Sequence, residues 1–179
     1  MSEIPETVVL LSDDGDVIGT APKATVHTVD TPLHLAFSCH VFDAQGRVLV
    51  TRRALGKATW PGVWTNSFCG HPAPGEDTAE AIVRRAQREL GLELTDVQVA
   101  LPDFRYRAVD ASGIVENEIC PVYVARAATD VAPADDEVAE WAWVDPSELR
   151  ASVEAAPFAF SPWLCWQLAA WPGDYRAAD

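Results

Sequence analysis

The sequence lacks both a long apolar segment and a block of basic residues. No run of about 18 apolar residues occurs, so we expect no membrane-spanning segment and no membrane partner. Lysines and arginines number 13 against 27 aspartates and glutamates, which gives a net charge of −14. A chain this acidic repels nucleic acid as a whole, so we expect no nucleic-acid partner. The first residues, MSEIPETVVLL, lack the basic segment that begins a secretory signal, which favours a cytoplasmic protein.

Cysteine is also scarce, and its spacing excludes the common redox and zinc-binding motifs. The four cysteines, Cys39, Cys69, Cys120 and Cys165, form no Cys-x-x-Cys pair. Without an export signal they are interpreted as reduced thiols. The chain has no internal repeat and no low-complexity linker, and 49% of it is hydrophobic. We therefore predict one globular domain spanning residues 1–179.

Strand patterns dominate the chain, and turn sequences join them in pairs. Alternating apolar residues on either side of DDGD, AQG and ASG predict three hairpins. Their strands are expected at residues 7–12 with 17–21, 34–43 with 47–53, and 97–110 with 114–127.

Fewer segments have helical spacing. One helix is expected after Asp77, which with Glu80 resembles a capping box, and it should end at Gly91. The remaining elements are expected at residues 140–144 (strand), 146–154 and 161–171 (helices). Strands with a few packed helices predict an α+β fold.

Two glutamates in the segment VENEI have the spacing of neighbours on one face of a strand. Side chains alternate along a strand, so Glu116 and Glu118 share a face, and Ile114 and Cys120 make that face apolar. Burial and mutual repulsion disfavour two ionised carboxylates there, so a metal ion is the expected compensation. The alternative is a different register in which both glutamates face solvent.

Only four histidines occur, and three of them lie near other chemically active residues. His27 and His34 are close in sequence, and His71 follows Cys69 by two positions. Three histidines with two co-facing glutamates would suit zinc, manganese or a similar divalent ion. A lone histidine is more often a core or surface residue, and His40 is expected to be structural.

Arginines gather in pairs despite the negative net charge. Arg52–Arg53 and Arg84–Arg85 indicate either a local anion site or ordinary surface ion pairs. Arg85 and Glu89 are four residues apart and share a helix face, which could offer a cation to a phosphate and a carboxylate to Mg²⁺. The alternative is a salt-bridged pair at the surface.

The predicted helix and the loop before it resemble the Nudix box. The matching residues are Gly70, Glu76, Arg84, Glu89, Gly91 and Leu92. Arg85 and Arg88 stand where the box has glutamates that hold catalytic metals, so diphosphate hydrolysis is disfavoured.

Longer stretches are similar to the type 1 isopentenyl-diphosphate isomerase family of the Nudix superfamily. They are TVHTVDTPLHLAFS, LVTRRA, WPGVWTNSFCGHP, PDFRYRA, GIVENEICPV and FSPW, and the match runs from about Val8 to Trp163. The resemblance implies a Nudix fold, in which α-helices flank a mixed central β-sheet. It also implies that residues 1–35 form an N-terminal extension that contributes metal ligands and covers the active site.

The resemblance implies a role for each matching residue. Cys69 corresponds to the catalytic thiol and Glu118 to the catalytic carboxylate on the opposite face of the substrate, with Tyr106 assisting it. The ligands implied for Mn²⁺ or Zn²⁺ are His27, His34, His71, Glu116 and Glu118. Glu89 and the backbone oxygen of Cys69 correspond to ligands of a Mg²⁺ shared with the diphosphate. The residues implied around the substrate are Lys23, Arg53, Lys57 and Arg85 at the diphosphate and Trp163 at the alkyl end.

The implied reaction interconverts isopentenyl diphosphate and dimethylallyl diphosphate in isoprenoid biosynthesis. One proton is added to the alkene and another removed, through a tertiary carbocation-like state, and Trp163 can stabilise positive charge nearby. The resemblance implies a small-molecule substrate, a monomer and no flavin. Other interpretations are a pyrophosphohydrolase, a non-catalytic metal-binding module and a protease-like pair of Cys69 with His71.

The third hairpin offers a test within the sequence. If Asp110 pairs with Ile114, then Tyr106 lies opposite Glu118 and on the same face of the sheet. A two-residue Ser–Gly turn would shift the register by one and separate Tyr106 from Glu118. The chemistry favours the first register.

Overall fold

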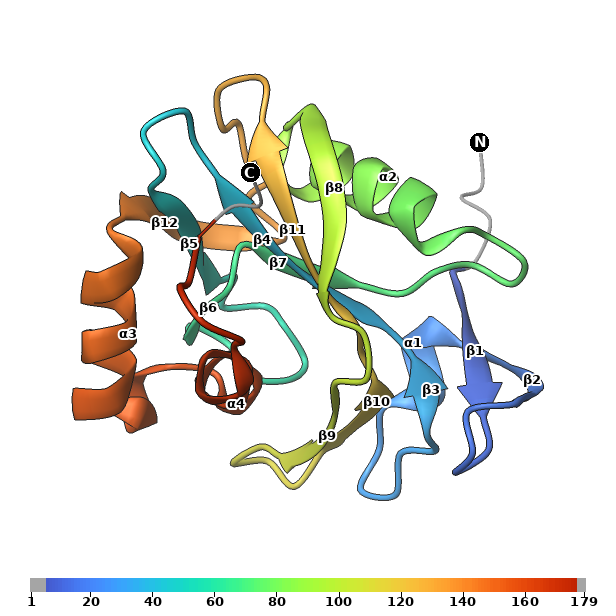
Figure 1. The fold of residues 1–179 in the computed structure, drawn as a ribbon. Helices are drawn as coiled ribbons and strands as arrows, with labels where there is room; N and C mark the ends of the chain where they lie inside the picture. The colour runs from blue at the N-terminus through green and yellow to red at the C-terminus, as the bar shows by residue number, and fades with distance from the viewer. Residues whose placement is uncertain (1–5, 177–179) are drawn as a thin grey trace.

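Two β-sheets form the frame of the molecule (Figure 1). A computed structural model describes residues 6–176. The five-stranded sheet has the order β2 (Val17–Pro22), β1 (Thr7–Leu11), β3 (His34–Leu35), β10 (Val115–Ile119) and β9 (Arg105–Val109). The second sheet has the order β12 (Val138–Val144), β5 (Val48–Arg53), β4 (Phe37–Phe42), β11 (Val122–Ala127) and β8 (Leu94–Leu101), with β6 (Trp64–Thr65) paired to β5 and β7 (Phe68–Gly70) paired to β4.

Helices cover both faces of this second sheet, except that the short helix α1 contacts β1 and β2 of the five-stranded sheet. They are α1 (Lys23–Val26), α2 (Thr78–Leu90), α3 (Pro146–Ala155) and α4 (Pro162–Ala170), with a 3₁₀ turn at Pro157–Ala159. Figure 1 shows α2 on one side of the sheet and α3 and α4 on the other. The predicted α+β architecture with a mixed sheet is confirmed, because β4 pairs with β11 in parallel and with β5 in antiparallel orientation. None of the helices described is both long and apolar enough to cross a membrane.

The predicted hairpins are present, but three of the predicted strands are each two shorter strands. The segment 34–43 breaks at Ala36, where the chain passes from the five-stranded sheet to the other sheet. The segments 97–110 and 114–127 break in the same way at Pro102 and Pro121. Proline has no N–H to donate to a strand ladder, so these positions favour a break. Each long hairpin therefore contributes to both sheets.

Helix α2 begins and ends at the residues that the sequence predicted. The side chain of Asp77 accepts hydrogen bonds from the backbone N–H groups of Ala79 and Glu80. Gly91 adopts the left-handed conformation with φ of 62° and ends the helix. One face of the helix is buried against the sheet, and this face carries Arg85 and Glu89 toward the site.

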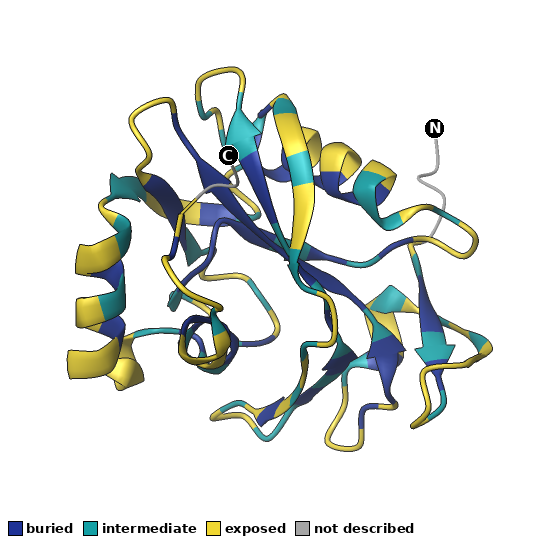
Figure 2. Ribbon diagram, viewed as in Figure 1, coloured by how far each residue is buried: buried dark blue, intermediate teal, exposed yellow. Residues whose placement is uncertain are grey.

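Strand β4 is buried along its whole length (Figure 2). Phe37, Cys39 and Val41 pack in the cluster that contains the buried residues of α2. Phe42 packs in a second cluster with residues of α3 and α4. Because side chains alternate along a strand, Ser38 and His40 share the face of Phe42 and lie toward α4.

The first strands and α1 lie over one side of the site, within the N-terminal extension that the resemblance implies. Glu6, Lys23 and His27 from this region line the pocket described below. Residues 1–5 of the predicted extension and 177–179 of the predicted domain lie outside the described residues.

Candidate active site

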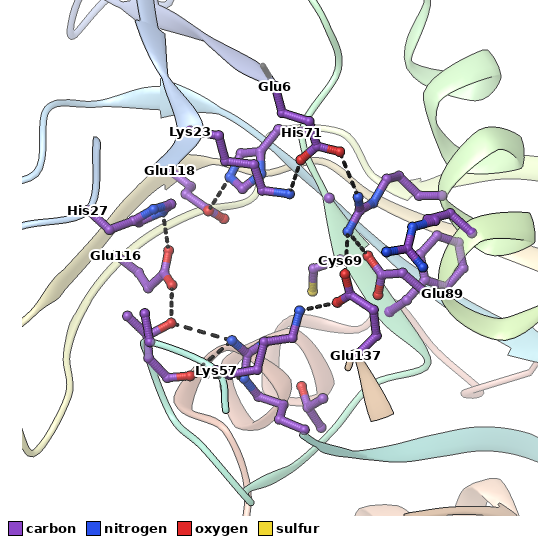
Figure 3. Close-up of a pocket in the computed structure, with 18 of the residues that line it drawn as sticks. Glu6, Lys23, His27, Lys57, Cys69, His71, Glu89, Glu116, Glu118 and Glu137 are labelled. Atoms are coloured by element: carbon purple, nitrogen blue, oxygen red, sulfur yellow. Dashed lines mark hydrogen bonds and ion pairs between the residues drawn. The ribbon is translucent and has the colours of Figure 1, made fainter. Parts of the chain in front are cut away.

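A pocket of about 1020 Å³ receives side chains from both sheets, from α1 and from α2. Figure 3 shows acidic and basic groups around its wall, with the sulfur of Cys69 directed toward its interior. Its lining includes charged side chains such as Lys57 and Arg85 and the apolar side chains of Phe68 and Trp163. Such a cavity can hold a small molecule that is charged at one end and apolar at the other.

Three predicted histidines converge on a single glutamate. One ligand atom from each of His27, His34, His71 and Glu118 lies within 4.8 Å of all the others. His71 Nε2 is 3.2 Å from Glu118 Oε1, and His34 Nε2 is 3.5 Å from the same oxygen. His71 is therefore engaged by Glu118, and the protease-like pair with Cys69 gains no support.

The donor set fits a divalent cation. His27 Nε2, His34 Nε2 and His71 Nδ1 are buried, and none of them makes a hydrogen bond of good geometry among the described residues, although carboxylate oxygens lie 3.1 Å from His27 Nε2 and 3.5 Å from His34 Nε2. His34 Nδ1 lies 2.9 Å from the Pro32 carbonyl, which can only accept, so Nδ1 carries a proton, and loss of any proton on Nε2 would leave that nitrogen's lone pair for a metal ion. An outer hydrogen bond of this kind orients a metal-ligating histidine. The cluster can hold a metal ion.

The inward face predicted for the two glutamates is confirmed, and the solvent-facing alternative is wrong. Glu116 is 7% exposed and Glu118 is 4% exposed. Burial alone would raise the pKa of Glu118, but hydrogen bonds and positive charge from His34 and His71 hold that pKa well below its usual range. Glu118 therefore stays ionised.

Glu116 lies beside the four-residue cluster and has different partners. Its carboxylate accepts a hydrogen bond from the Thr59 hydroxyl at 2.7 Å and lies 3.1 Å from His27 Nε2. The structure thus links Glu116 to the cluster through His27. Of the five residues that the sequence assigns to this metal site, four converge directly and Glu116 adjoins them.

Cys69 is held at the pocket by strand pairing. Strand β7 pairs with β4 so that Cys69 lies directly opposite Ser38, and the Ser38 Oγ to Cys69 Sγ distance is 3.2 Å. The sulfur is also 3.5 Å from Oδ1 of Asn66. Burial raises the pKa of Cys69 to about 12, although Ser38 and Asn66 oppose this shift. The group at this position is therefore a neutral thiol that carries a proton.

Tyr106 lies where the preferred hairpin register places it. The backbone N–H of Asp110 donates to the Ile114 carbonyl at 2.9 Å, and Tyr106 is the cross-strand partner of Glu118. The predicted register is confirmed. Burial and the charge of Glu118 raise the pKa of Tyr106 well above its ordinary value, so its phenol keeps its proton.

Trp163 forms part of the apolar wall. It is 2% exposed, and its indole N–H donates to Asn66 Oδ1 at 3.1 Å. Its ring centroid lies 5.8 Å from that of Tyr106. The guanidinium of Arg53 lies 5.6 Å from the Trp163 ring centroid, within the range of a cation–π interaction.

The predicted diphosphate-binding residues line the same pocket, and most are paired with carboxylates (Figure 3). Lys23 pairs with Glu6, and Lys57 pairs with Glu137. Arg85 is 5% exposed and contacts Glu89, so the interpretation of these two residues as a surface pair is wrong.

Two further pairs place Arg85 at the centre of a charge network. Its guanidinium lies 3.0 Å from a Glu6 oxygen and 3.6 Å from a Glu137 oxygen. Arg53 differs from the other cations because it donates to the carbonyl of Thr59, at 2.9 and 3.1 Å. An anion entering the pocket would compete with the carboxylates for Lys23, Lys57 and Arg85.

The Nudix-box residues have structural roles that the sequence did not specify. Arg84 makes two hydrogen bonds of 2.7 Å to the Glu76 carboxylate at the start of the helix. A Cβ atom on Gly70 would lie 2.8 Å from the Phe37 ring and 3.0 Å from the Arg85 side chain. Glycine at position 70 therefore lets β7, which carries Cys69, lie close against α2.

Several residues of the site were not predicted from the sequence. Thr59 binds both Glu116 and Arg53, and Glu137 pairs with two of the cations. Glu137 follows two aspartates in the sequence and resembles an ordinary solvated acidic segment. Asn66 and Ser38 lie in stretches that support the family resemblance, but that resemblance assigned them no contact with the thiol.

The chain is similar to known proteins along most of its length. The profile of the NUDIX domain family matches residues 32–164. An isopentenyl-diphosphate Delta-isomerase of Clavibacter michiganensis subsp. michiganensis is 70% identical over 168 residues, which cover 94% of this chain and 87% of that protein. A protein of the same name from Leifsonia xyli subsp. xyli is 67% identical, with coverage of 92% and 90%.

Solved structures share the fold at low sequence identity. One from Deinococcus radiodurans is 19% identical, with a TM-score of 0.71 and coverage of 92% of this chain and 98% of that chain. A MutT protein from Methanosarcina mazei Go1 is 17% identical, with a TM-score of 0.59 and coverage of 77% and 91%. These two similarities concern the fold alone.

Proposed function

The chain belongs to the NUDIX family and, within it, to the isopentenyl-diphosphate Delta-isomerases, and from this premise we propose how its own residues carry out the reaction. It interconverts isopentenyl diphosphate and dimethylallyl diphosphate by adding one proton and removing another. The observation that carries the proposal is a proton-bearing thiol, Cys69, and a buried carboxylate, Glu118, in one pocket with a cluster of cations.

The cations hold the charged end of the substrate. Lys23, Lys57 and Arg85 bind the diphosphate in place of their present carboxylate partners, and Arg53 borders the same region. Binding the diphosphate fixes the alkyl end near Cys69, which turns proton transfer into a reaction between positioned groups. Trp163 and Phe68 surround the alkyl end with apolar surface and exclude water that would trap a cation as an alcohol.

Cys69 and Glu118 act on the two faces of the bound alkene. One adds a proton to the terminal methylene, which leaves positive charge on the tertiary carbon. The other removes a proton from the carbon next to the diphosphate-bearing methylene, which forms the new double bond. Tyr106, directly opposite Glu118 in the sheet, keeps its phenolic proton and assists that carboxylate. The Trp163 ring stabilises the transient positive charge, by about 1–2 kcal/mol in a dry pocket.

Metal ions complete the site. His27, His34, His71 and Glu118, with Glu116 alongside, would hold Mn²⁺ or Zn²⁺, and Glu89 with the Cys69 backbone oxygen would hold Mg²⁺. Bound there, such ions supply positive charge to the diphosphate and to the carboxylates. No flavin is needed, because the reaction moves protons and no electrons.

We further propose that the enzyme is a monomeric, cytoplasmic, single-domain protein. The net charge of −14 supports the absence of a nucleic-acid partner.

The test is a product assay with purified protein, Mg²⁺ and isopentenyl diphosphate. We expect dimethylallyl diphosphate with no release of phosphate. Release of phosphate without any shift of the double bond would instead indicate a pyrophosphohydrolase. Unchanged isomerisation by Glu118→Gln would remove the assigned role of that carboxylate.

A further inference from the structure

A row of fully buried polar groups leads from the C-terminal segment to the catalytic pocket. Ser38 and His40 lie on the α4-facing side of β4, and each is 0% exposed. Gln167 of α4 is also 0% exposed and lies between them. Polar groups inside a core are costly unless they are hydrogen-bonded, so this row requires an explanation.

Four hydrogen bonds join these groups to the thiol. The Tyr175 hydroxyl lies 2.6 Å from His40 Nδ1, and His40 Nε2 lies 2.9 Å from Gln167 Oε1. Gln167 Nε2 lies 2.8 Å from Ser38 Oγ, which in turn lies 3.2 Å from Cys69 Sγ. The series therefore ends on the catalytic sulfur.

The chemistry of each group sets the direction of donation. Burial lowers the pKa of His40 to about 4, so near neutral pH the ring carries a single proton. The amide oxygen of Gln167 can only accept, which places that proton on Nε2 and leaves Nδ1 to accept from the Tyr175 hydroxyl. The reverse direction would leave the buried Tyr175 proton without an acceptor among the described residues.

The Ser38 hydroxyl accepts a hydrogen bond from the Gln167 amide, so fewer acceptors remain for the Ser38 proton. Its hydroxyl has one hydrogen and two lone pairs, and its partners are Gln167 and the sulfurs of Cys69 and Cys120, the latter at 3.4 Å. Gln167 occupies one lone pair, and the Ser38 proton can go to one of the two sulfurs. Cys69 is the nearer sulfur, and its own thiol can donate to Asn66 Oδ1 at 3.5 Å, so it can accept the Ser38 proton.

We propose that Gln167 is a positioning residue that fixes the Ser38 hydroxyl as a donor to Cys69. This inference rests on the proposed catalytic role of Cys69. When Cys69 gives its proton to the substrate, the sulfur becomes negative, and a donor already aimed at it stabilises that charge without reorganisation. Gln167 touches neither substrate nor sulfur and acts through Ser38.

The test is a double-mutant cycle with Gln167→Met and Ser38→Ala. Methionine keeps the size of glutamine without its amide, and alanine removes only the hydroxyl. We expect Gln167→Met to lower kcat roughly 10-fold and Ser38→Ala by at least as much, with KM within about twofold of wild type. Because both changes remove the same donor, the double variant should match Ser38→Ala alone.

A structural role for Gln167 predicts a different result. Its effect would then multiply with that of Ser38→Ala, or would appear in KM and thermal stability while kcat is unchanged, and either result overturns the proposal. If Gln167→Met does not fold, Tyr175→Phe removes only the first donor of the series. Tyr175→Phe should lower kcat about 2–5-fold when it is introduced into the wild-type protein, and should not lower kcat further when it is introduced into Ser38→Ala.

A second measurement separates this proposal from the proposed function. Alkylation of Cys69 by iodoacetamide, followed by peptide mass spectrometry at one fixed pH, requires no isomerase activity. We expect slower alkylation of Cys69 in Gln167→Met, with Cys165 in the same sample as an internal reference. Equal rates in wild type and variant would overturn the positioning role even if isomerisation is confirmed.

Discussion

The thiol and the carboxylate that we propose as catalytic share one pocket but hold their protons differently. Burial raises the pKa of Cys69 to about 12, whereas two histidines hold the pKa of Glu118 well below its usual range. Environments that separate the pKa values of two neighbouring groups are typical of acid–base sites. At the residue scale, the site therefore combines a protonated thiol, Cys69, with an ionised carboxylate, Glu118.

The first prediction concerns this thiol. Cys69→Ser keeps the shape of the side chain but replaces the thiol with a hydroxyl that ionises far less readily. We expect kcat to fall by about 10³-fold or more, with the circular dichroism spectrum and melting temperature nearly unchanged. Cys165→Ser is the matched control, because Cys165 is a free, half-buried cysteine that does not line the pocket. Equal activity of both variants would contradict the role given to Cys69.

The second prediction concerns His40, which lies outside the metal cluster. Burial lowers its pKa from 6.5 to about 4. Between these values the unfolded chain binds a proton that the folded protein does not, so stability is lost as the pH falls from about 6.5 toward 4. The loss attributable to His40 is on the order of 3 kcal/mol.

Urea titrations of wild type and His40→Gln at several pH values check this assignment. The substitution should flatten the pH dependence of the unfolding free energy within that window, because glutamine does not titrate. Other groups titrate in both proteins, so the difference between them is the informative quantity. A difference that does not change with pH would show that His40 titrates normally in the fold.

Helix α2 and strand β7 are the elements that set the geometry of the site. The helix brings Arg85 and Glu89 to the pocket, and the strand brings Cys69. Gly70 allows the two elements to approach closely, and Gly91 ends the helix where the chain turns. Both glycines belong to the Nudix-box pattern, and here they serve packing and backbone conformation.

The third prediction tests the end of this helix. A Cβ atom at Gly91 would lie 2.7 Å from the Ala132 carbonyl oxygen, and φ at this residue is +62°. We expect Gly91→Ala to lower the free energy of unfolding by about 2–3 kcal/mol, from backbone strain and the clash together. Gly75→Ala is the control, because φ there is +78° with no heavy atom within 4 Å of the added Cβ.

The control should cost only the backbone strain, about 1 kcal/mol. Both values come from thermal or urea unfolding. Equal destabilisation by the two substitutions would mean that the contact with Ala132 is relieved at little cost.

Helix ends and hairpins were predictable from the sequence, because nearby residues determine them. The assignment of the strands to two separate sheets was not predictable. Asp77 and Gly91 marked the ends of α2, because caps are determined by nearby residues. The chemistry of Glu118 and Tyr106 selected the correct hairpin register. The break at Ala36 carries no local signal, since it depends on which distant strands pair with His34 and Phe37.

At the scale of the whole molecule, the site exists because distant segments meet. Its cluster of possible metal ligands joins the N-terminal region, the residue that follows β7 and the third hairpin. The residue types that bind metal were visible in the sequence, and their convergence required the fold. The series from Tyr175 to Ser38 was not predicted, because no sequence pattern links Ser38 with Gln167, which lies 129 positions later.

The fourth prediction concerns metal binding to this assembled cluster. Mn²⁺ added at about 100 times its dissociation constant should stabilise the protein by roughly 2.7 kcal/mol, because the cluster forms only in the folded state. His71→Ala should lose most of this gain. His40→Gln should keep it, since His40 is the one histidine outside the cluster. A similar gain in melting temperature for His71→Ala and wild type would place the ion elsewhere.

The most direct test of the account is proton exchange in deuterated water. Isopentenyl diphosphate is incubated with the enzyme and Mg²⁺ in D₂O, and the product is examined by NMR and mass spectrometry. We predict dimethylallyl diphosphate that carries deuterium in a methyl group, because the added proton comes from an exchangeable group such as the Cys69 thiol. Product without deuterium, or phosphate release with the double bond unmoved, would contradict protonation by the residues of this pocket.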